Sequence, residues 1–143
     1  GNQFFPLVDV KLKTEKNQII LKALVDSGAT YSVFRAEIGE YLGIEIEKGK
    51  PVYLEGVGGR ILGYMHNVLI SLDRRFYKCK IIFSRELTVS FNILGRDNFF
   101  YPFLITFFEK KRKIIFWRKS YYEKGNGTCI NSCRKRLTGY TSW

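Results

Sequence analysis

The chain has 143 residues, of which 45% are hydrophobic and 16% aromatic. This length suits one domain with one hydrophobic core, and the apolar content excludes an intrinsically disordered chain. No apolar run approaches the roughly 18 residues that a membrane-spanning helix needs. The chain begins at Gly1 without a signal-peptide pattern, so we expect a segment that has been processed, tagged or cut from a longer protein.

The formal net charge of +11 is unevenly distributed. Residues 1–109 hold 14 Lys and Arg against 12 Asp and Glu, whereas residues 110–143 hold 10 against one acid. A basic tail is usually a solvated segment, with RNA, DNA or an anionic membrane as its alternative partners. Nucleic acid is therefore not an expected partner of the folded part, and only the tail keeps that alternative open.

The chain has three cysteines, Cys79, Cys129 and Cys133, and one histidine, His66. Cys79 lies in an apolar run and is predicted to be a small core residue. An odd cysteine count and a single histidine fit neither a disulfide scaffold nor a zinc site. We therefore expect no metal or other cofactor, and a reducing, cytoplasmic location.

Short apolar stretches separated by turn residues run through the first 117 residues. In chain order they predict strands at 8–13 and 18–25, a short helix at 35–42 ended by Gly43, two strands within 53–72 joined around 56–59, strands at 75–83 and 91–95, a helical turn at 96–101, and paired strands at 103–108 and 113–117. This pattern predicts a mainly β domain over residues 1–117, with one or two short helices and a sheet closed into a barrel. Residues 118–143 are predicted to be a basic, polar C-terminal appendage.

One motif can carry chemistry. Asp26-Ser27-Gly28 directly follows the apolar strand that ends in Ala23-Leu24-Val25. Such a triplet is by itself compatible with an ordinary tight turn, in which Asp and Ser bind the backbone and Gly supplies a positive φ. Its position after a core strand favours a carboxylate held on a stiff loop, where chemistry needs a fixed geometry.

A second signal follows 69 residues after Asp26, where Asn92-Ile93-Leu94-Gly95 precedes Arg96-Asp97. A glycine-rich hairpin around Gly56, Gly58, Gly59 and Gly63 lies between the two motifs. In this order the three pieces resemble the retropepsin-like aspartic protease family over about residues 5–117. The resemblance implies a closed-barrel acid protease fold.

The resemblance also implies roles for the residues of the active-site loop. Asp26 would be the catalytic carboxylate, and the loop would continue through Ser27, Gly28, Ala29 and Thr30. The hydroxyl of Ser27 would hold two such loops together across a dimer. Gly28 would let the substrate backbone approach closely.

Two further segments receive roles by the same resemblance. The hairpin at 53–64 would be a flap over substrate, with substrate-binding residues Val57, Gly58, Gly59 and Ile61. The loop formed by Leu94, Gly95 and Arg96 would buttress the active-site loop.

The chain departs from the retroviral pattern in two places. Thr30 follows Ala29 where retroviral enzymes commonly carry an acid, so Arg96 lacks its usual partner. Asp97, or a backbone carbonyl, is the expected replacement. Retroviral dimers interleave short chain ends, whereas this chain continues for 26 residues after Trp117.

Hydrolysis of a peptide by this chemistry needs two carboxylates that share a proton, one acting as base and the other as acid. The chain has one such triplet and no internal repeat, so the hypothesis requires a homodimer that acts on a peptide or protein substrate. Two alternatives stay open. One is a non-catalytic peptide-binding or dimerisation module of the same fold, and the other is a nucleic-acid-associated β-domain acting through the basic tail. His66 is predicted to be a surface or packed residue.

Overall fold

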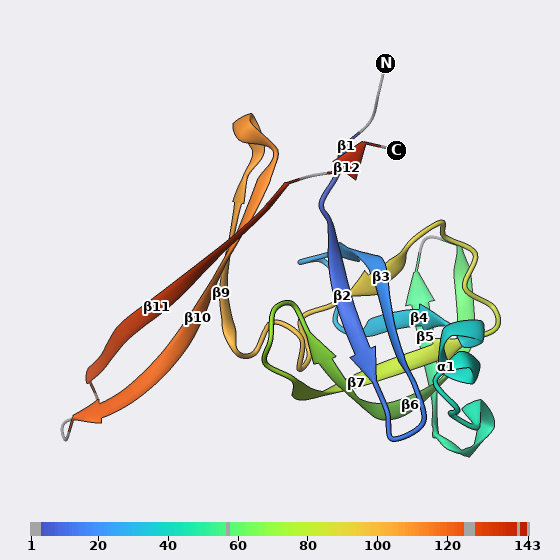
Figure 1. The fold of residues 1–143 in the computed structure, drawn as a ribbon. Helices are drawn as coiled ribbons and strands as arrows, with labels where there is room; N and C mark the ends of the chain where they lie inside the picture. Colours follow the sequence, from blue (N-terminus) through green and yellow to red (C-terminus); the bar gives the residue numbers. More distant parts are fainter. Residues whose placement is uncertain (1–3, 57, 125–127, 140, 143) are drawn as a thin grey trace.

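The computed structural model describes residues 4–56, 58–124, 128–139 and 141–142, with side chains as far as Arg118 (Figure 1). Strands dominate it: β1 (Phe4–Phe5), β2 (Leu7–Lys13), β3 (Gln18–Val25), β4 (Ser32–Arg35), β5 (Lys50–Gly56), β6 (Gly59–Ser71), β7 (Tyr77–Ser84), β8 (Asn92–Leu94), β9 (Phe103–Phe108), β10 (Lys113–Lys124), β11 (Thr128–Gly139) and β12 (Thr141–Ser142). Its helices are α1 (Ala36–Tyr41) and two 3-10 turns, η1 (Ile46–Lys48) and η2 (Glu109–Lys111).

The central sheet closes on itself. Its strand order is β2-β3-β8-β4-β7-β6-β5, and β2 also pairs with β6, so six strands form a ring. Strand β5 stays outside the ring and pairs only with β6, as the outer arm of a hairpin. This architecture confirms the predicted mainly β, closed-barrel, retropepsin-like fold with a short helix.

The first hairpin shows how the sequence pattern sets the register. Val8, Val10 and Leu12 are buried while Asp9 and Lys13 are exposed, the period of two that a half-buried strand requires. Strands β2 and β3 pair antiparallel from Leu7↔Leu24 to Lys13↔Gln18, as predicted. The barrel core lies on the buried side of this hairpin.

Helix α1 ends as its sequence predicts. Gly43 has a φ of +78°, and its N–H donates to the carbonyl oxygen of Glu40 at 2.9 Å. Inside the helix, Gly39 permits close packing on the barrel, because a Cβ there would lie 2.6 Å from Cδ1 of Ile46 and 3.0 Å from Cδ1 of Phe83. The helix therefore covers one side of the barrel at β7 and η1.

The predicted helical turn at 96–101 is wrong, because this segment forms a series of turns. Asn98 has a φ of +63°, the left-handed conformation that interrupts a helix and that Asn tolerates. Its side-chain oxygen accepts the N–H of Lys80 at 3.2 Å, and the following Phe99 is fully buried. Tertiary packing thus overrides the local helical pattern.

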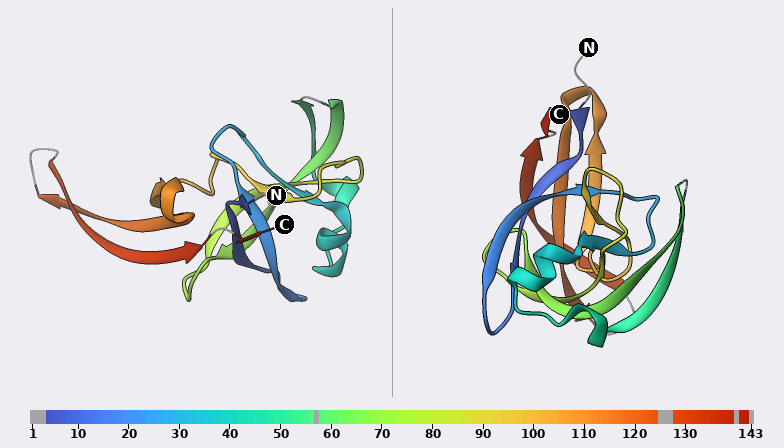
Figure 2. Two further views of the ribbon diagram at one scale, coloured as in Figure 1. Left: turned by 90° about the horizontal axis from the view of Figure 1, so that it is seen from above. Right: turned by 90° about the vertical axis from the view of Figure 1, so that its right-hand side faces the viewer.

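Strands β9 and β10 form the predicted hairpin, from Phe103↔Arg118 to Lys113↔Phe108. An aromatic cluster attaches it to the barrel: the ring of Phe116 lies 6.3 Å from Phe99 and 5.5 Å from Phe103. The hydroxyl of Tyr77 on β7 donates to the Phe99 carbonyl at 3.0 Å. Figure 2 shows the hairpin standing beside the barrel and continuing away from it.

Strand β10 runs on past Trp117 to Lys124 and pairs along its whole length with β11, while β12 pairs with β1. The extension of β10 beyond Trp117 and the strands β11 and β12 were not predicted, since the tail has no apolar alternation. The division into residues 1–117 and 118–143 stays a prediction, and the backbone of β10 crosses it without a break.

Cys79 is fully buried, as predicted, and burial raises the pKa of its thiol to about 12. Burial also raises the pKa of the neighbouring Tyr77 hydroxyl. Neither group is therefore charged at neutral pH. Over the described part of the chain, no helix is long and apolar enough to cross a membrane.

The aromatic cluster predicts a large effect on stability. Phe116→Ala should lower the free energy of unfolding by about 3–5 kcal/mol, because it removes a fully buried ring between Phe99 and Phe103. Urea denaturation measures this change. Thr106→Ala, at an exposed position of the same hairpin, should change stability by less than about 0.5 kcal/mol. Equal effects of the two substitutions would show that the hairpin is not anchored by this cluster.

Candidate active site

The carboxylate of Asp26 is held at the point where two parallel strands end. Strands β3 and β8 run side by side with Val25 opposite Leu94, and the N–H of Asp26 donates to the Leu94 carbonyl at 3.0 Å. The half-buried carboxylate accepts the N–H of Gly28 at 2.9 Å through Oδ1. The loop closes with the N–H of Ala29, which donates to the Asp26 carbonyl at 3.2 Å. Hydrogen bonds from backbone N–H groups therefore fix where this carboxylate lies.

The loop after β8 is bound to the Asp26 loop by a second set of hydrogen bonds. The N–H of Arg96 donates to the Ala29 carbonyl at 2.9 Å, and that of Asp97 to the Thr30 carbonyl at 2.7 Å. A Cβ on Gly95 would lie 2.3 Å from the carbonyl oxygen of Tyr31, so only glycine permits this approach. The predicted buttressing residues Leu94, Gly95 and Arg96 are therefore in direct backbone contact with the segment that carries Asp26.

The side chain of Arg96 has a different partner from those expected. Its guanidinium donates to the Thr30 hydroxyl at 3.4 Å, whereas Asp97 and the backbone carbonyls were the expected acceptors. The Asp97 carboxylate instead accepts from the side-chain amide of Asn98 at 3.1 Å. The residue that replaces the retroviral acid therefore still contacts Arg96, as a neutral acceptor.

Sequence reasoning missed Ser32, and it named Asn92 only as part of the second motif, without a role for its side chain. Ser32 is 1% exposed, and its hydroxyl oxygen accepts the N–H of Gly95 at 3.0 Å. The side-chain oxygen of Asn92 accepts the N–H of Arg35 at 3.0 Å, which joins β8 to β4. The available signal was a polar residue within or beside each apolar strand, a position that is stable only with a hydrogen-bond partner.

The predicted flap is the β5–β6 hairpin, whose last pair is Gly56↔Gly59. Gly59 has a φ of +105°, which only glycine adopts without strain, and Gly58 and Gly59 are both exposed. Ile61 is half-buried opposite Leu54. The expectation for Val57 falls outside the described residues. Figure 2 shows the hairpin extending beyond the barrel.

The base of this hairpin is anchored, in contrast to its tip. A Cβ on Gly63 would lie 2.3 Å from Cγ2 of Ile82, and the Ser84 hydroxyl donates to the Leu62 carbonyl at 2.6 Å. At the tip, a Cβ on Gly56, Gly58 or Gly59 would meet nothing within 4 Å. The hairpin is thus packed at one end and open at the other.

Comparison with known proteins agrees with this geometry. The sequence model of a family described as aspartyl protease matches residues 9–97, more than half of the chain. The chain belongs to the aspartyl protease family. The solved structure of EIAV protease, in complex with the inhibitor HBY-793, is similar at 25% sequence identity and a TM-score of 0.50. The similarity covers 64% of this chain and 82% of that protein. No curated protein matches the chain.

Apart from Asp26, the residue types that often carry chemistry have structural roles in this aspartyl protease domain. The Nε2 atom of His66 lies 2.8 Å from the carbonyl oxygen of Ile46, and the half-buried ring packs 6.1 Å from that of Phe83. Within the part of the chain that the structure describes, His, Cys, Asp and Glu side chains form no group of three that could hold a metal ion. Asp26 is consequently the residue to test first.

The buried serine beside the active-site loop gives a test of its geometry. Ser32→Ala should destabilise the domain by about 1–3 kcal/mol, since the buried N–H of Gly95 loses its acceptor. The midpoint of urea denaturation measures this. Ser90→Ala, at an exposed position, serves as the matched control and should leave stability unchanged. Unchanged stability in Ser32→Ala would contradict the structural role assigned to its hydroxyl.

Proposed function

We propose that the chain is an aspartic endopeptidase in which the Asp26 carboxylates of two copies form one catalytic pair. The observation that carries the proposal is the fixed Asp26 loop, bound on one side to Leu94 and on the other to the loop at Gly95–Asp97. A position held by backbone hydrogen bonds between core strands has the rigidity that catalytic geometry demands. Membership of the aspartyl protease family supports the same chemistry.

The second copy is required by the chemistry. One carboxylate takes a proton from water while the other donates a proton to the peptide carbonyl oxygen, and the attacking water oxygen adds to the carbonyl carbon. Two adjacent carboxylates cannot both ionise easily, so the pair shares one proton and supplies acid and base at one pH. The chain has a single Asp-Ser-Gly triplet, so a two-fold symmetric dimer supplies the second carboxylate.

Substrate would bind as an extended strand beneath the two flaps. Backbone hydrogen bonds hold such a strand, and side-chain pockets select its sequence. The open glycine tip and the packed base of the β5–β6 hairpin support a flap that moves at its end and stays anchored on the barrel. Half-buried Leu54 and Ile61 on facing strands favour apolar substrate side chains.

The central prediction concerns Asp26. Asp26→Asn should abolish cleavage of a mixed peptide library, because an amide can neither accept the proton from water nor share one with its partner. Its fold and dimerisation should be retained, since the hydrogen bonds of the loop are made largely by the backbone. Cleavage between about pH 4 and 7 measures the activity, and sedimentation measures the oligomeric state.

The control for this experiment is Asp9→Asn. Among the described residues, Asp9 forms an ion pair only with Lys22, on the exposed side of the β2–β3 hairpin, so its substitution should leave cleavage unchanged. Peptide cleavage by the Asp26→Asn protein would contradict the proposal. A wild-type dimer that binds peptides without cutting them would point to the non-catalytic binding module instead.

A further inference from the structure

The β9–β10 hairpin has two faces of different character. Residues opposite each other in an antiparallel pair lie on the same face, and alternate pairs lie on opposite faces. The inner face packs against the barrel and is formed by Phe103↔Arg118, Ile105↔Phe116 and Phe107↔Ile114. The outer face is formed by Leu104↔Trp117, Thr106↔Ile115 and Phe108↔Lys113.

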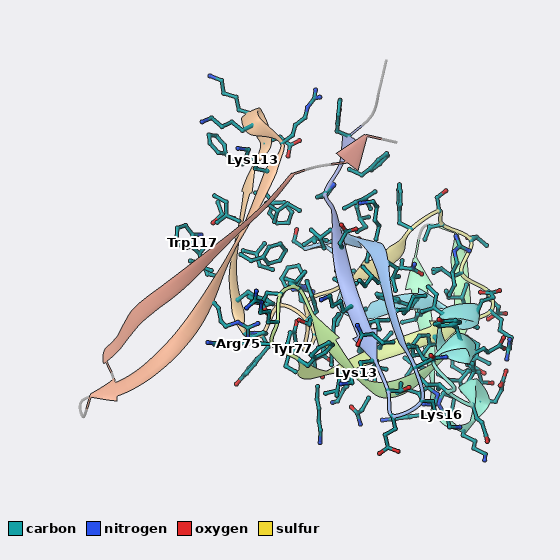
Figure 3. All side chains as sticks on the ribbon, viewed as in Figure 1. Lys13, Lys16, Arg75, Tyr77, Lys113 and Trp117 are labelled. Carbon is teal, nitrogen blue, oxygen red and sulfur yellow. The ribbon has the colours of Figure 1, made fainter. Side chains whose placement is uncertain are left out.

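The outer face is rich in apolar side chains that the core does not use. Leu104 is 52% exposed and Phe108 41% exposed, and Ile115 and Trp117 are half-buried. Figure 3 shows Trp117 on the side of β10 that faces away from the barrel. Large exposed apolar groups gathered on one surface mark an interaction site.

The same face is bordered by cations. Lys110, Lys111, Arg112 and Lys113 follow one another through η2, and all four are exposed. The Nζ atom of Lys111 lies 5.5 Å from the centre of the Phe108 ring. Among the side chains that the structure describes, the three lysines form no ion pair. Their charge is therefore available to an anionic partner.

The pairing of β11 extends this basic character along the sheet. Its backbone register sets Lys135 opposite Trp117. Residues 110–143 carry ten basic residues against the single acid Glu123. The basic residues of this segment are therefore not confined to the η2 turn.

We propose that the outer face of the β9–β10 hairpin binds single-stranded nucleic acid. Phe108 and Trp117 would stack on bases, and Lys110, Lys111 and Lys113 would contact phosphates, the combination that sequence-tolerant single-strand sites use. Positions 104 and 108 on β9 lie about 13 Å apart along the strand, and Leu104 is the cross-strand partner of Trp117. A run of bases stacked about 3.4 Å apart would span the distance between positions 104 and 108.

The arrangement favours a nucleic acid over a lipid surface. A membrane-docking element separates a continuous apolar side from a charged side. Here Lys113 is paired with Phe108 within one face, so a cation and an aromatic ring lie side by side at the η2 end of that face. A cation beside an aromatic ring suits a partner in which bases and phosphates alternate. The proposal does not depend on the protease chemistry.

The first test uses the tryptophan in the proposed site as its reporter. The chain has two tryptophans, so Trp143→Phe leaves Trp117 as the only one. Titration with an oligothymidylate longer than the roughly 4–16 nucleotides of known single-strand sites should quench its fluorescence. A protein that carries Asp26→Asn together with Trp143→Phe should bind the oligothymidylate with the same affinity. This result separates the present proposal from the proposed function. Absence of quenching would overturn the proposal.

The second test uses two charge-matched double variants. Lys111→Glu with Lys113→Glu should weaken oligonucleotide binding at least tenfold and lower its salt slope by about 1.4, since each phosphate contact on a single strand contributes about 0.7. Lys13→Glu with Lys16→Glu changes the net charge equally, and Figure 3 places both residues on the barrel away from Lys113. This control should bind within about twofold of wild type, given that screened charges outside the site contribute little.

Two results of these experiments would contradict the proposal. An equal loss of affinity in both double variants would show that only net charge attracts the oligonucleotide. Binding to vesicles of phosphatidylserine and phosphatidylcholine, without binding to the oligonucleotide, would assign the face to a membrane.

Discussion

The backbone hydrogen bonds between the Asp26 loop and the loop after β8 are the constraint on which this domain depends. They run from the N–H of Asp26 to Leu94 and from the N–H groups of Arg96 and Asp97 to the opposite loop. Each neutral bond contributes only about 0.5–1.5 kcal/mol to net stability, but a buried group left unpaired would cost about 1–3 kcal/mol. The loop therefore has one acceptable conformation, and the Asp26 carboxylate has one position.

This constraint also explains why the site tolerates a departure from the retroviral pattern. Thr30 in place of an acid leaves Arg96 without an ion pair among the described residues, yet the backbone bonds at Ala29 and Thr30 are kept. An exposed ion pair contributes little in any case. The geometry of the loop thus depends on the backbone and on Ser32, and the identity of the Arg96 partner is secondary.

Local patterns were sufficient to predict most of the barrel. Alternation at Val8, Val10 and Leu12 predicted the first hairpin, and Gly43 predicted the end of α1, because in each case the physical cause lies within a few residues. Closure of the ring by β2 and β6 joins residues far apart in the sequence and leaves no local signal. A serine inside the apolar strand at Ser32 indicates a hydrogen-bond partner, but does not indicate that this partner is Gly95. The helical pattern at 96–101 gave a wrong prediction for the same reason. The hydrogen bond to Lys80 and the packing of Phe99 determine the turn at Asn98.

The candidate site was predictable only in part. The motif at Asp26 and the glycine at position 95 were visible in the sequence, but the hydroxyl partner of Arg96 was not. The β9–β10 hairpin was predicted as a pair of strands, whereas the sharing of faces between Trp117, Phe108 and Lys113 requires the register. The barrel carries the proposed catalytic site, and the outer face of the β9–β10 hairpin carries the proposed binding site.

The central claim is that two Asp26 carboxylates, one from each chain, form a single active site. Mixing wild-type protein with Asp26→Asn protein at constant total concentration, under conditions that let dimers exchange, tests it directly. If heterodimers with one carboxylate are inactive, activity falls as the square of the wild-type fraction, to about a quarter at equal amounts, as random pairing in a two-fold dimer requires. A linear fall to about a half would show that each chain acts alone and would contradict the account.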